Sequence, residues 1–221
     1  MRQLLYAFSL IFALAANPAL ALDKGDIILR GGAGLIFPND DADDLTGVPG
    51  ATVGVDNSTT FAFTAGYMFH DQLAIELLGI WPANHEVEGE GILPALGITD
   101  VGELDIFPPT LSLNYYFMPK QKFHPHIGVG INYSVYWDTS ASSQTKAVLG
   151  QGTDLDISHS VGWAVNVGAD YELNDHFFLT ANLWYVDIEA EASLKSTALG
   201  KLDVDVDVDP LVALIGIGVK F

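Results

Sequence analysis

Large apolar residues alternate with small or polar residues along most of this chain. Residues 61–69 read FAFTAGYMF, in which Phe61, Phe63 and Tyr67 occupy one set of alternate positions. Residues 127–137 repeat the pattern, with glycine, asparagine and serine between most of the large side chains. Successive side chains of an extended strand point to opposite faces, so a period of two indicates strands rather than helices. The chain is therefore predicted to be all-β.

Eight stretches of the chain show this alternation, and we predict one strand in each. The predicted strands span residues 25–37, 58–69, 73–85, 104–117, 125–137, 160–172, 177–190 and 204–221. Three short spacers alternate with four long ones, at 38–57, 86–103, 138–159 and 191–203. Short turns at one end and long loops at the other are typical of outer-membrane barrels. The pattern predicts an eight-stranded antiparallel transmembrane β-barrel.

The last predicted strand distinguishes this barrel from a soluble, lipocalin-like barrel with the same alternation. Its odd positions 211–219 are all apolar and lead to Phe221, whereas its even positions include Gly216, Gly218 and Lys220. A small soluble barrel needs bulky side chains inside, but the bulk here lies opposite the glycines. The bulky face is therefore expected to face lipid. As in other barrels of this kind, Phe221 is expected to be part of the signal read by the barrel assembly machinery.

The first 21 residues have the layout of a secretory signal peptide. Arg2 precedes an apolar stretch at 4–16, and Ala19-Leu20-Ala21 fits a small-x-small cleavage site. A retained helical anchor is the alternative, but about 13 apolar residues fall short of the roughly 20 that span a bilayer. We predict that residues 1–21 are removed and that residues 22–221 form a single outer-membrane β-barrel domain.

The charge of the chain excludes several classes of partner and chemistry. It has 28 acidic and 9 basic residues, a formal net charge of −19 and no cysteine. Nucleic-acid binding needs a concentrated basic face, so we expect no nucleic-acid partner. Without cysteine there is no disulfide and no thiolate metal site. If the acidic groups face anionic lipopolysaccharide, divalent cations are needed to bridge the two.

Three predicted strands continue beyond the membrane with acidic residues on one face and apolar residues on the other. Residues 203–209 alternate aspartate with valine, for example. A membrane-spanning strand needs only about 9 to 11 residues, so these stretches extend above the hydrocarbon. We predict a funnel with a charged outer wall and an apolar inner wall. The inner wall would consist of Leu104, Ile106, Trp184, Val186, Ile188, Val204, Val206 and Val208.

The predicted funnel has one alternative, and two of the predicted strands do not fit it directly. The alternative is that the extended hairpins pack their inner faces against one another without leaving a channel. In addition, the third and sixth strands fit only with a change of register, because Glu86 and Glu88 share parity with the inward Glu76. Pro82 is a candidate position for such a change.

Lower in the predicted barrel the inward positions are polar and would form a plug of Arg30, Glu76, Asn114 and Asn132. An eight-stranded barrel is only wide enough for its own side chains, so these groups are expected to pair, Arg30 with Glu76. An apolar solute passing straight down would break hydrogen bonds at about 1 to 3 kcal/mol each. Sideways exit into the bilayer is therefore the expected route.

Four segments together resemble the OmpW family of outer-membrane proteins (OmpW/AlkL-like). They are 107–117 (FPPTLSLNYYF), 126–133 (HIGVGINY), 184–188 (WYVDI) and the carboxyl-terminal 208–221. The resemblance implies a narrow barrel in the outer membrane of a Gram-negative bacterium, with an apolar interior for small hydrophobic solutes. In that family a channel tryptophan precedes the glycine of the sixth strand. Here Val161 precedes Gly162, so this role is not transferred to Trp163.

No catalytic site, metal site or cofactor is predicted, and we expect a protein that is not an enzyme. Ser158 and His159 are adjacent, but neighbours on a strand point to opposite faces. His124 and His126 share a face and are interpreted as solvated turn residues. The acidic runs lack the spacing of calcium-binding loops. Two alternatives stay open: a structural or receptor barrel that contacts phage, bacteriocins or host surfaces through its loops, and an outer-membrane lipid hydrolase.

Overall fold

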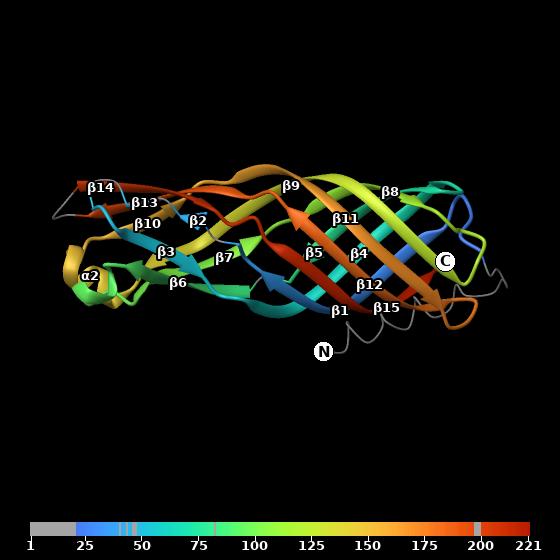
Figure 1. The fold of residues 1–221 in the computed structure, drawn as a ribbon, viewed down its shortest axis with the longest axis horizontal. Helices are drawn as coiled ribbons and strands as arrows, with labels where there is room; N and C mark the ends of the chain where they lie inside the picture. The colour runs from blue at the N-terminus through green and yellow to red at the C-terminus, as the bar shows by residue number, and fades with distance from the viewer. Residues whose placement is uncertain (1–20, 40, 43, 46–47, 82, 197–199) are drawn as a thin grey trace, which may run out of the picture.

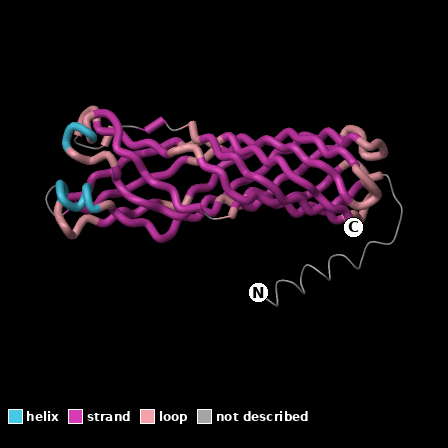
Figure 2. Tube along the Cα trace, turned by 90° about the horizontal axis from the view of Figure 1, so that it is seen from below, coloured by secondary structure: helices cyan, strands magenta, loops and turns pink. Residues whose placement is uncertain are grey.

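The computed structural model of the chain describes residues 21–39, 41–42, 44–45, 48–81, 83–196 and 200–221. These residues form one elongated barrel whose strands run along its long axis, with turns at both ends and the short helices at one of them (Figures 1 and 2). The predicted signal peptide lies outside the described residues except for Ala21, and its removal stays a prediction.

One half of the molecule, which we call the lower barrel, is a closed cylinder of eight antiparallel strands. Around the cylinder the order is β11-β12-β15-β1-β4-β5-β8-β9, and β9 pairs back to β11. The first and last of these strands along the chain pair from Ile28 opposite Lys220 onward. The predicted eight-stranded antiparallel barrel is therefore confirmed. The bounds are β1 (Ile27–Phe37), β4 (Ser58–His70), β5 (Leu73–Ile80), β8 (Thr110–Tyr116), β9 (Phe123–Ala141), β11 (Ser160–Glu172), β12 (Phe177–Val186) and β15 (Leu211–Lys220).

The other half, the upper barrel, consists of shorter strands together with the end of β9 (Figure 1, left). These strands are β2 (Asp41–Ala42), β3 (Ala51–Val55), β6 (Ala83–Gly91), β7 (Asp100–Phe107), β10 (Asp154–Ile157), β13 (Glu189–Ser196) and β14 (Gly200–Asp207). They pair in the orders β9-β7-β6-β3 and β10-β13-β14-β2. The 3₁₀ turn η2 (Pro94–Leu96) follows β6, and helix α2 (Ser143–Leu149) follows β9. Of the helices described, none is long and apolar enough to cross a membrane.

The prediction of four long loops was wrong in large part, because much of that sequence extends the barrel. The strands β3 and β10 lie in supposed loops, and β9 continues to Ala141. Glycine and carboxylates at the outward positions disguise these strands, since both are disfavoured by strand propensity. Prolines explain two other errors of boundary. Pro108, Pro109 and Pro210 lack an N–H for the ladder and divide two predicted strands into β7 and β8 and into β14 and β15.

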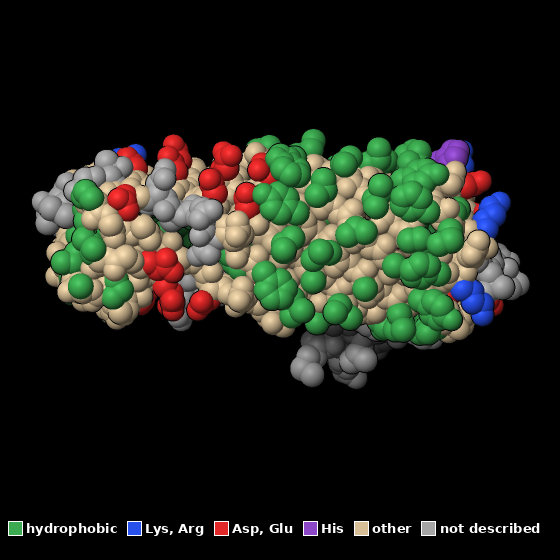
Figure 3. Space-filling view, in the orientation of Figure 1, with side chains coloured by type: hydrophobic (Ala, Val, Ile, Leu, Met, Phe, Trp, Pro, Cys, Tyr) green, Lys and Arg blue, Asp and Glu red, His purple; other side chains and the backbone are tan. Residues whose placement is uncertain are grey.

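Large apolar side chains cover the outside of the lower barrel. Val129, Ile131 and Ile217 are 61%, 66% and 59% exposed. Figure 3 shows hydrophobic side chains spread over this half of the visible face, with charged side chains beyond its two ends. Such an apolar belt bounded by aromatic girdles matches the surface that lipid requires. The exposed aromatic residues include Phe61, Trp81, Tyr133, Trp137 and Trp163 toward the upper barrel, and Tyr67, Phe69, Tyr115, Phe117 and Tyr171 at the opposite edge.

The upper barrel reverses this polarity. Glu189, Glu191, Asp205 and Asp207 are exposed on its outer wall, and Figure 3 shows acidic side chains gathered there. The side chains that alternate with them point inward and belong to a cluster of buried apolar residues. The alternation predicted for 203–209 is thus observed, with aspartate outside and valine inside.

The third and sixth predicted strands do change register between the two halves. Even positions such as Ala74 and Glu76 are buried on β5, but Val87, an odd position, is buried on β6. In the same way Asn166 is buried on β11, whereas Leu155 is the buried position of β10. Each strand therefore exchanges its inward and outward faces, which brings apolar residues inside the upper barrel from these strands too.

Candidate functional site

Three small apolar cavities follow one another inside the upper barrel. The first, the transition cavity, has a volume of about 70 Å³ and lies next to the lower barrel; Ile36, Ile80, Ile106, Ile188 and Val212 are among its lining residues. The middle cavity, about 60 Å³, includes Val53, Val87, Leu155, Val204 and Val206. The tip cavity, about 110 Å³, includes Leu45, Leu93, Ile98, Leu149 and Leu202.

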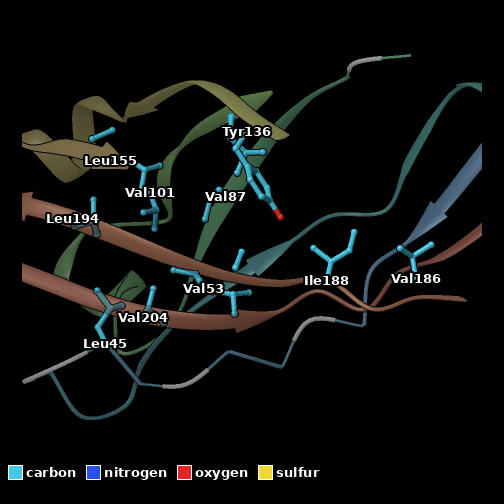
Figure 4. Packing of buried hydrophobic residues seen from close by; sticks show 14 of the residues in the cluster. Leu45, Val53, Val87, Val101, Tyr136, Leu155, Val186, Ile188, Leu194 and Val204 are labelled. Carbon is cyan, nitrogen blue, oxygen red and sulfur yellow. The ribbon is translucent and has the colours of Figure 1, made fainter. Parts of the chain in front are cut away.

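Neighbouring cavities share walls, so they form a series rather than three separate voids. Leu104, Tyr136 and Val208 line both the transition and the middle cavity, and so does Val55. Val101 and Leu194 line both the middle and the tip cavity. Figure 4 shows many of these side chains converging from strands on opposite sides of the interior. The side chains of these shared residues form the partitions between neighbouring cavities.

The structure places six of the eight predicted lining residues on these cavities. Leu104 and Val208 lie on two of them, Ile106 and Ile188 on the transition cavity, and Val204 and Val206 on the middle cavity. Trp184 and Val186 belong to the same buried cluster but are not among the residues that line the three cavities. Both lie on β12, where Trp184 is opposite Asn166 of the lower barrel.

Several cavity residues were missed by the sequence argument. Val87 and Leu155 follow the register changes and could not be assigned a face from parity alone. Tyr136 could have been found, because it shares parity with the inward Asn132 on the same strand. It is 7% exposed and is one of the residues that line both the transition and the middle cavity.

Below the cavities, the interior of the lower barrel is filled by hydrogen-bonded polar groups centred on Arg30. Its guanidinium pairs with Glu76, as predicted, and also with Asp170 through Nε to Oδ1 (3.0 Å) and Nη2 to Oδ2 (2.6 Å). Nη1 donates to Thr64 Oγ1 (3.2 Å) and Nη2 to Tyr116 Oη (2.8 Å). All five N–H groups of the guanidinium therefore have a partner.

The hydrogen-bond network continues around the interior from Asp170. Thr180 Oγ1 donates to Asp170 Oδ1 (2.7 Å) and accepts from Asn182 Nδ2 (2.7 Å), and Asn182 Oδ1 lies 2.8 Å from His126 Nε2. This connected set around Arg30 occupies the cross-section of the barrel. We refer to it, with the predicted Asn114 and Asn132, as the polar plug.

The two predicted asparagines lie in the same interior but are bonded differently. Asn132 Nδ2 donates to Thr110 Oγ1 (3.0 Å), and Asn132 Oδ1 accepts from Ser134 (2.8 Å). Asn114 is fully buried and has no hydrogen-bond partner among the described residues. Its amide occupies the space beside Gly128, where an added Cβ would lie 1.8 Å from Asn114 Oδ1. The glycine is thus required by the width of the barrel.

Comparison with known proteins identifies the family. The OmpW family model matches residues 23–221. This chain belongs to the OmpW family. It is 37% identical to outer membrane protein W of Vibrio cholerae over the full length of both chains. The crystal structure of OprG from Pseudomonas aeruginosa superposes with a TM-score of 0.84 and 37% identity, covering 92% of this chain and 99% of that one. The dibenzothiophene metabolism operon protein PahQ of P. aeruginosa is 28% identical, covering 79% and 77% of the two chains.

Membership of this family confirms the predicted location in the outer membrane of a Gram-negative bacterium. It also identifies the apolar belt of the lower barrel as the surface in contact with membrane lipid. Phe221 closes this surface. Its backbone N–H and C=O exchange hydrogen bonds of 3.0 Å with Ile27, and its side chain is half-buried.

The interpretation of His124 and His126 as solvated turn residues was wrong. Both side chains point into the barrel and are 1% and 0% exposed. His124 Nε2 lies 3.2 Å from Glu172 Oε1, which also pairs with Lys220. The sequence pattern could have predicted this, because both histidines occupy even positions of β9 and therefore lie on the same face as Gly128. No group of histidine and carboxylate residues able to hold a metal is found among the described side chains.

Residues at the junction of β10 and β11 have structural contacts. His159 Nδ1 accepts a hydrogen bond from the backbone N–H of Tyr136 (3.3 Å), and its ring packs edge-on against Tyr133. Trp163 is 51% exposed on the outer surface, where it packs on Tyr185. Trp163 thus faces away from the interior, and the channel role that the resemblance implied for a tryptophan of the sixth strand does not apply to it.

Proposed function

We propose that this OmpW-family barrel is a passive channel that carries small hydrophobic molecules across the lipopolysaccharide leaflet. The observation that carries the proposal is the series of apolar cavities, which extends from the tip to the middle of the molecule. The leaflet outside is polar and cross-bridged, so an apolar interior offers a solute a route of lower free energy. Such a route needs no catalysis and no cofactor.

Sideways release into the bilayer is the exit that the geometry favours. Straight passage is opposed by the polar plug, because all five donors of Arg30 would have to be uncovered. The transition cavity, in contrast, reaches Trp81, whose side chain is 65% exposed on the outer wall. Pro108 and Pro210 line the same cavity at strand breaks. Proline donates no backbone hydrogen bond, so the ladder of strand hydrogen bonds is interrupted at these positions.

The relatives and the surface charge agree with this proposal. One relative, PahQ, is named for an operon of dibenzothiophene metabolism, and dibenzothiophene is a small apolar molecule. The acidic outer wall of the upper barrel suits lipopolysaccharide bridged by divalent cations. Phe221 is proposed as the residue through which the barrel assembly machinery recognises the chain.

The test compares inward and outward changes on neighbouring residues. Val206→Asp places a carboxylate in the apolar middle cavity, where an unpaired charge either is strongly destabilising or draws in water. Asp205→Asn changes the exposed neighbour on the same strand. Cells with equal amounts of each folded barrel are assayed for uptake of a radiolabelled medium-chain alkane. We expect uptake to fall at least about tenfold for Val206→Asp and to be unchanged for Asp205→Asn.

Two results would contradict the proposal. Unchanged uptake in both variants, or an equal loss in both, would mean that solutes do not pass through the cavities. The barrel would then act through its loops as a structural or receptor protein.

A further inference from the structure

Tyr136 carries the polar group at the centre of the apolar cavities. It lies on β9 in the wall shared by the transition and middle cavities and is 7% exposed. Its neighbours in that shared wall, Val55, Leu104 and Val208, are aliphatic. Figure 4 shows its ring extending into the interior with the hydroxyl directed toward the side of Ile188.

The hydroxyl of Tyr136 has no hydrogen-bond partner among the described residues. Ser134, on the same face of β9, lies near the phenol, but it donates its own hydroxyl proton to Asn132 Oδ1 (2.8 Å). A buried hydroxyl without a partner is destabilising, and phenylalanine would fill the same space without that cost. Packing alone therefore does not account for a tyrosine here.

The position of the phenol is fixed by the backbone around it. The N–H of Tyr136 donates to His159 Nδ1 (3.3 Å), and the residue is paired with Ile106 of β7. These contacts hold Tyr136 at the level where β9 leaves β11 and approaches β10. The hydroxyl is thus presented at one defined depth, between cavities above and below it.

We propose that Tyr136 is a solute-binding residue that donates a hydrogen bond to an oxygen of the passing molecule. The solute class is neutral and amphiphilic: a hydrocarbon chain or ring with one ester, carbonyl or hydroxyl oxygen. The hydrocarbon part occupies the apolar cavities on either side, and the oxygen meets the phenol. This inference rests on the proposed channel function and specifies its substrates.

Charge excludes the anionic members of the same chemical series. The chain carries 28 acidic and 9 basic residues, and carboxylates cover the outer wall around the cavities. An ionised carboxylic acid is repelled by this wall and would lose its hydration in a cavity without a cationic partner. A methyl ester keeps the acceptor oxygen without the charge.

The test uses Tyr136→Phe, which removes only the hydroxyl, and the matched control Tyr133→Phe, which removes a phenol from the outer face of the same strand. Cells with equal amounts of folded barrel take up three radiolabelled probes of equal chain length: an alkane, a fatty acid methyl ester and the free acid. We expect wild type to prefer the ester over the alkane and to discriminate against the acid. Tyr136→Phe should lower the ester-to-alkane ratio about three- to tenfold, the value of one hydrogen bond in an apolar site. Tyr133→Phe should leave it unchanged.

A spectroscopic measurement observes the bond directly. With the barrel in lipid nanodiscs, the infrared carbonyl band of a ¹³C-labelled ester should shift to lower frequency in wild type and Tyr133→Phe, and not in Tyr136→Phe. An unchanged uptake ratio together with an unchanged band would overturn the role of Tyr136 while leaving the channel intact. Uptake of neither alkane nor ester by wild type would overturn the channel itself, and this inference with it.

Discussion

The lower and upper barrels are built from the same alternating strands but with opposite polarity. In the lower barrel, Ile131 and Ile217 face outward and Arg30 and Asp170 face inward. In the upper barrel, Asp205 faces outward and the valines beside it face inward. Lipid requires the apolar exterior below, and water permits the charged exterior above. The interior polarity is set independently, and it changes at the level where prolines interrupt the strands.

The two interiors also differ in how completely they are filled. Below, an added Cβ on Gly168 would lie 1.9 Å from Asn182 Oδ1 and 2.6 Å from His126 Nε2. Above, three cavities remain among the aliphatic side chains. A network of directional hydrogen bonds holds one geometry, whereas aliphatic contacts rearrange without a specific loss. The lower interior is therefore suited to block passage and the upper interior to yield to a solute.

The largest effect is expected when the polar plug loses its central cation. Arg30→Met leaves Glu76 and Asp170 buried without their partner, which should lower the free energy of unfolding by about 3 to 5 kcal/mol. The matched control is Lys195→Met, which breaks an ion pair with Asp156 whose side chains are 57% and 61% exposed. Water screens that pair, so no measurable change is expected. Urea unfolding of the refolded barrels, followed by heat-modifiable gel mobility, measures both.

A second variant separates charge from packing in the plug. Adding Glu76→Gln and Asp170→Asn to Arg30→Met removes the uncompensated charges and should recover a large part of the lost stability. If Arg30→Met and Lys195→Met were equally mild, the plug would not stabilise the lower barrel, and the distinction between the two interiors would be wrong.

Adding methyl groups to each interior should give a smaller, opposite pair of effects. Gly168→Ala forces apart the hydrogen bond between His126 and Asn182 and should lower stability by about 1 to 3 kcal/mol. Ala190→Val adds two methyl groups beside the middle cavity and should be neutral or stabilising, while reducing alkane uptake. The same unfolding and uptake assays apply. A loss of stability in Ala190→Val as large as in Gly168→Ala would show that the upper interior is as tightly filled as the lower.

The sequence predicts more about faces than about contacts. Alternation alone put Arg30 and Glu76 on the inner face, and the ion pair follows because both are inward and opposite in charge. It did not select Asp170 as the second partner, since that contact depends on the register between strands about 140 residues apart.

The cavities could not be predicted from the alternation of residues, for a different reason. Alternation identifies Val204 and Val206 as inward, but whether inward chains meet or leave space depends on the radius of the barrel and the sizes of residues on every other strand. The register changes before Val87 and Leu155 add to this, because parity cannot be carried across a break. The sequence therefore predicted which face of the funnel wall is apolar, but not how much space the inward side chains leave between them.

The smallest effect is expected on the outer wall of the upper barrel, where a pH dependence can be tested. Lys201 Nζ (2.8 Å) and the Ser193 hydroxyl (2.7 Å) bind Asp203 Oδ1 and hold the pKa of this exposed carboxyl below its usual value near 3.8. A lowered folded-state pKa stabilises the fold above the usual value, and this contribution disappears as the pH falls through the folded-state pKa. Because the pair is exposed, solvent screens it. Asp203→Asn should therefore shift the urea midpoint barely at pH 7 and not at all at pH 2. A shift at pH 7 comparable with that of Arg30→Met would show that the charged wall, and not the apolar interior, holds the upper barrel together.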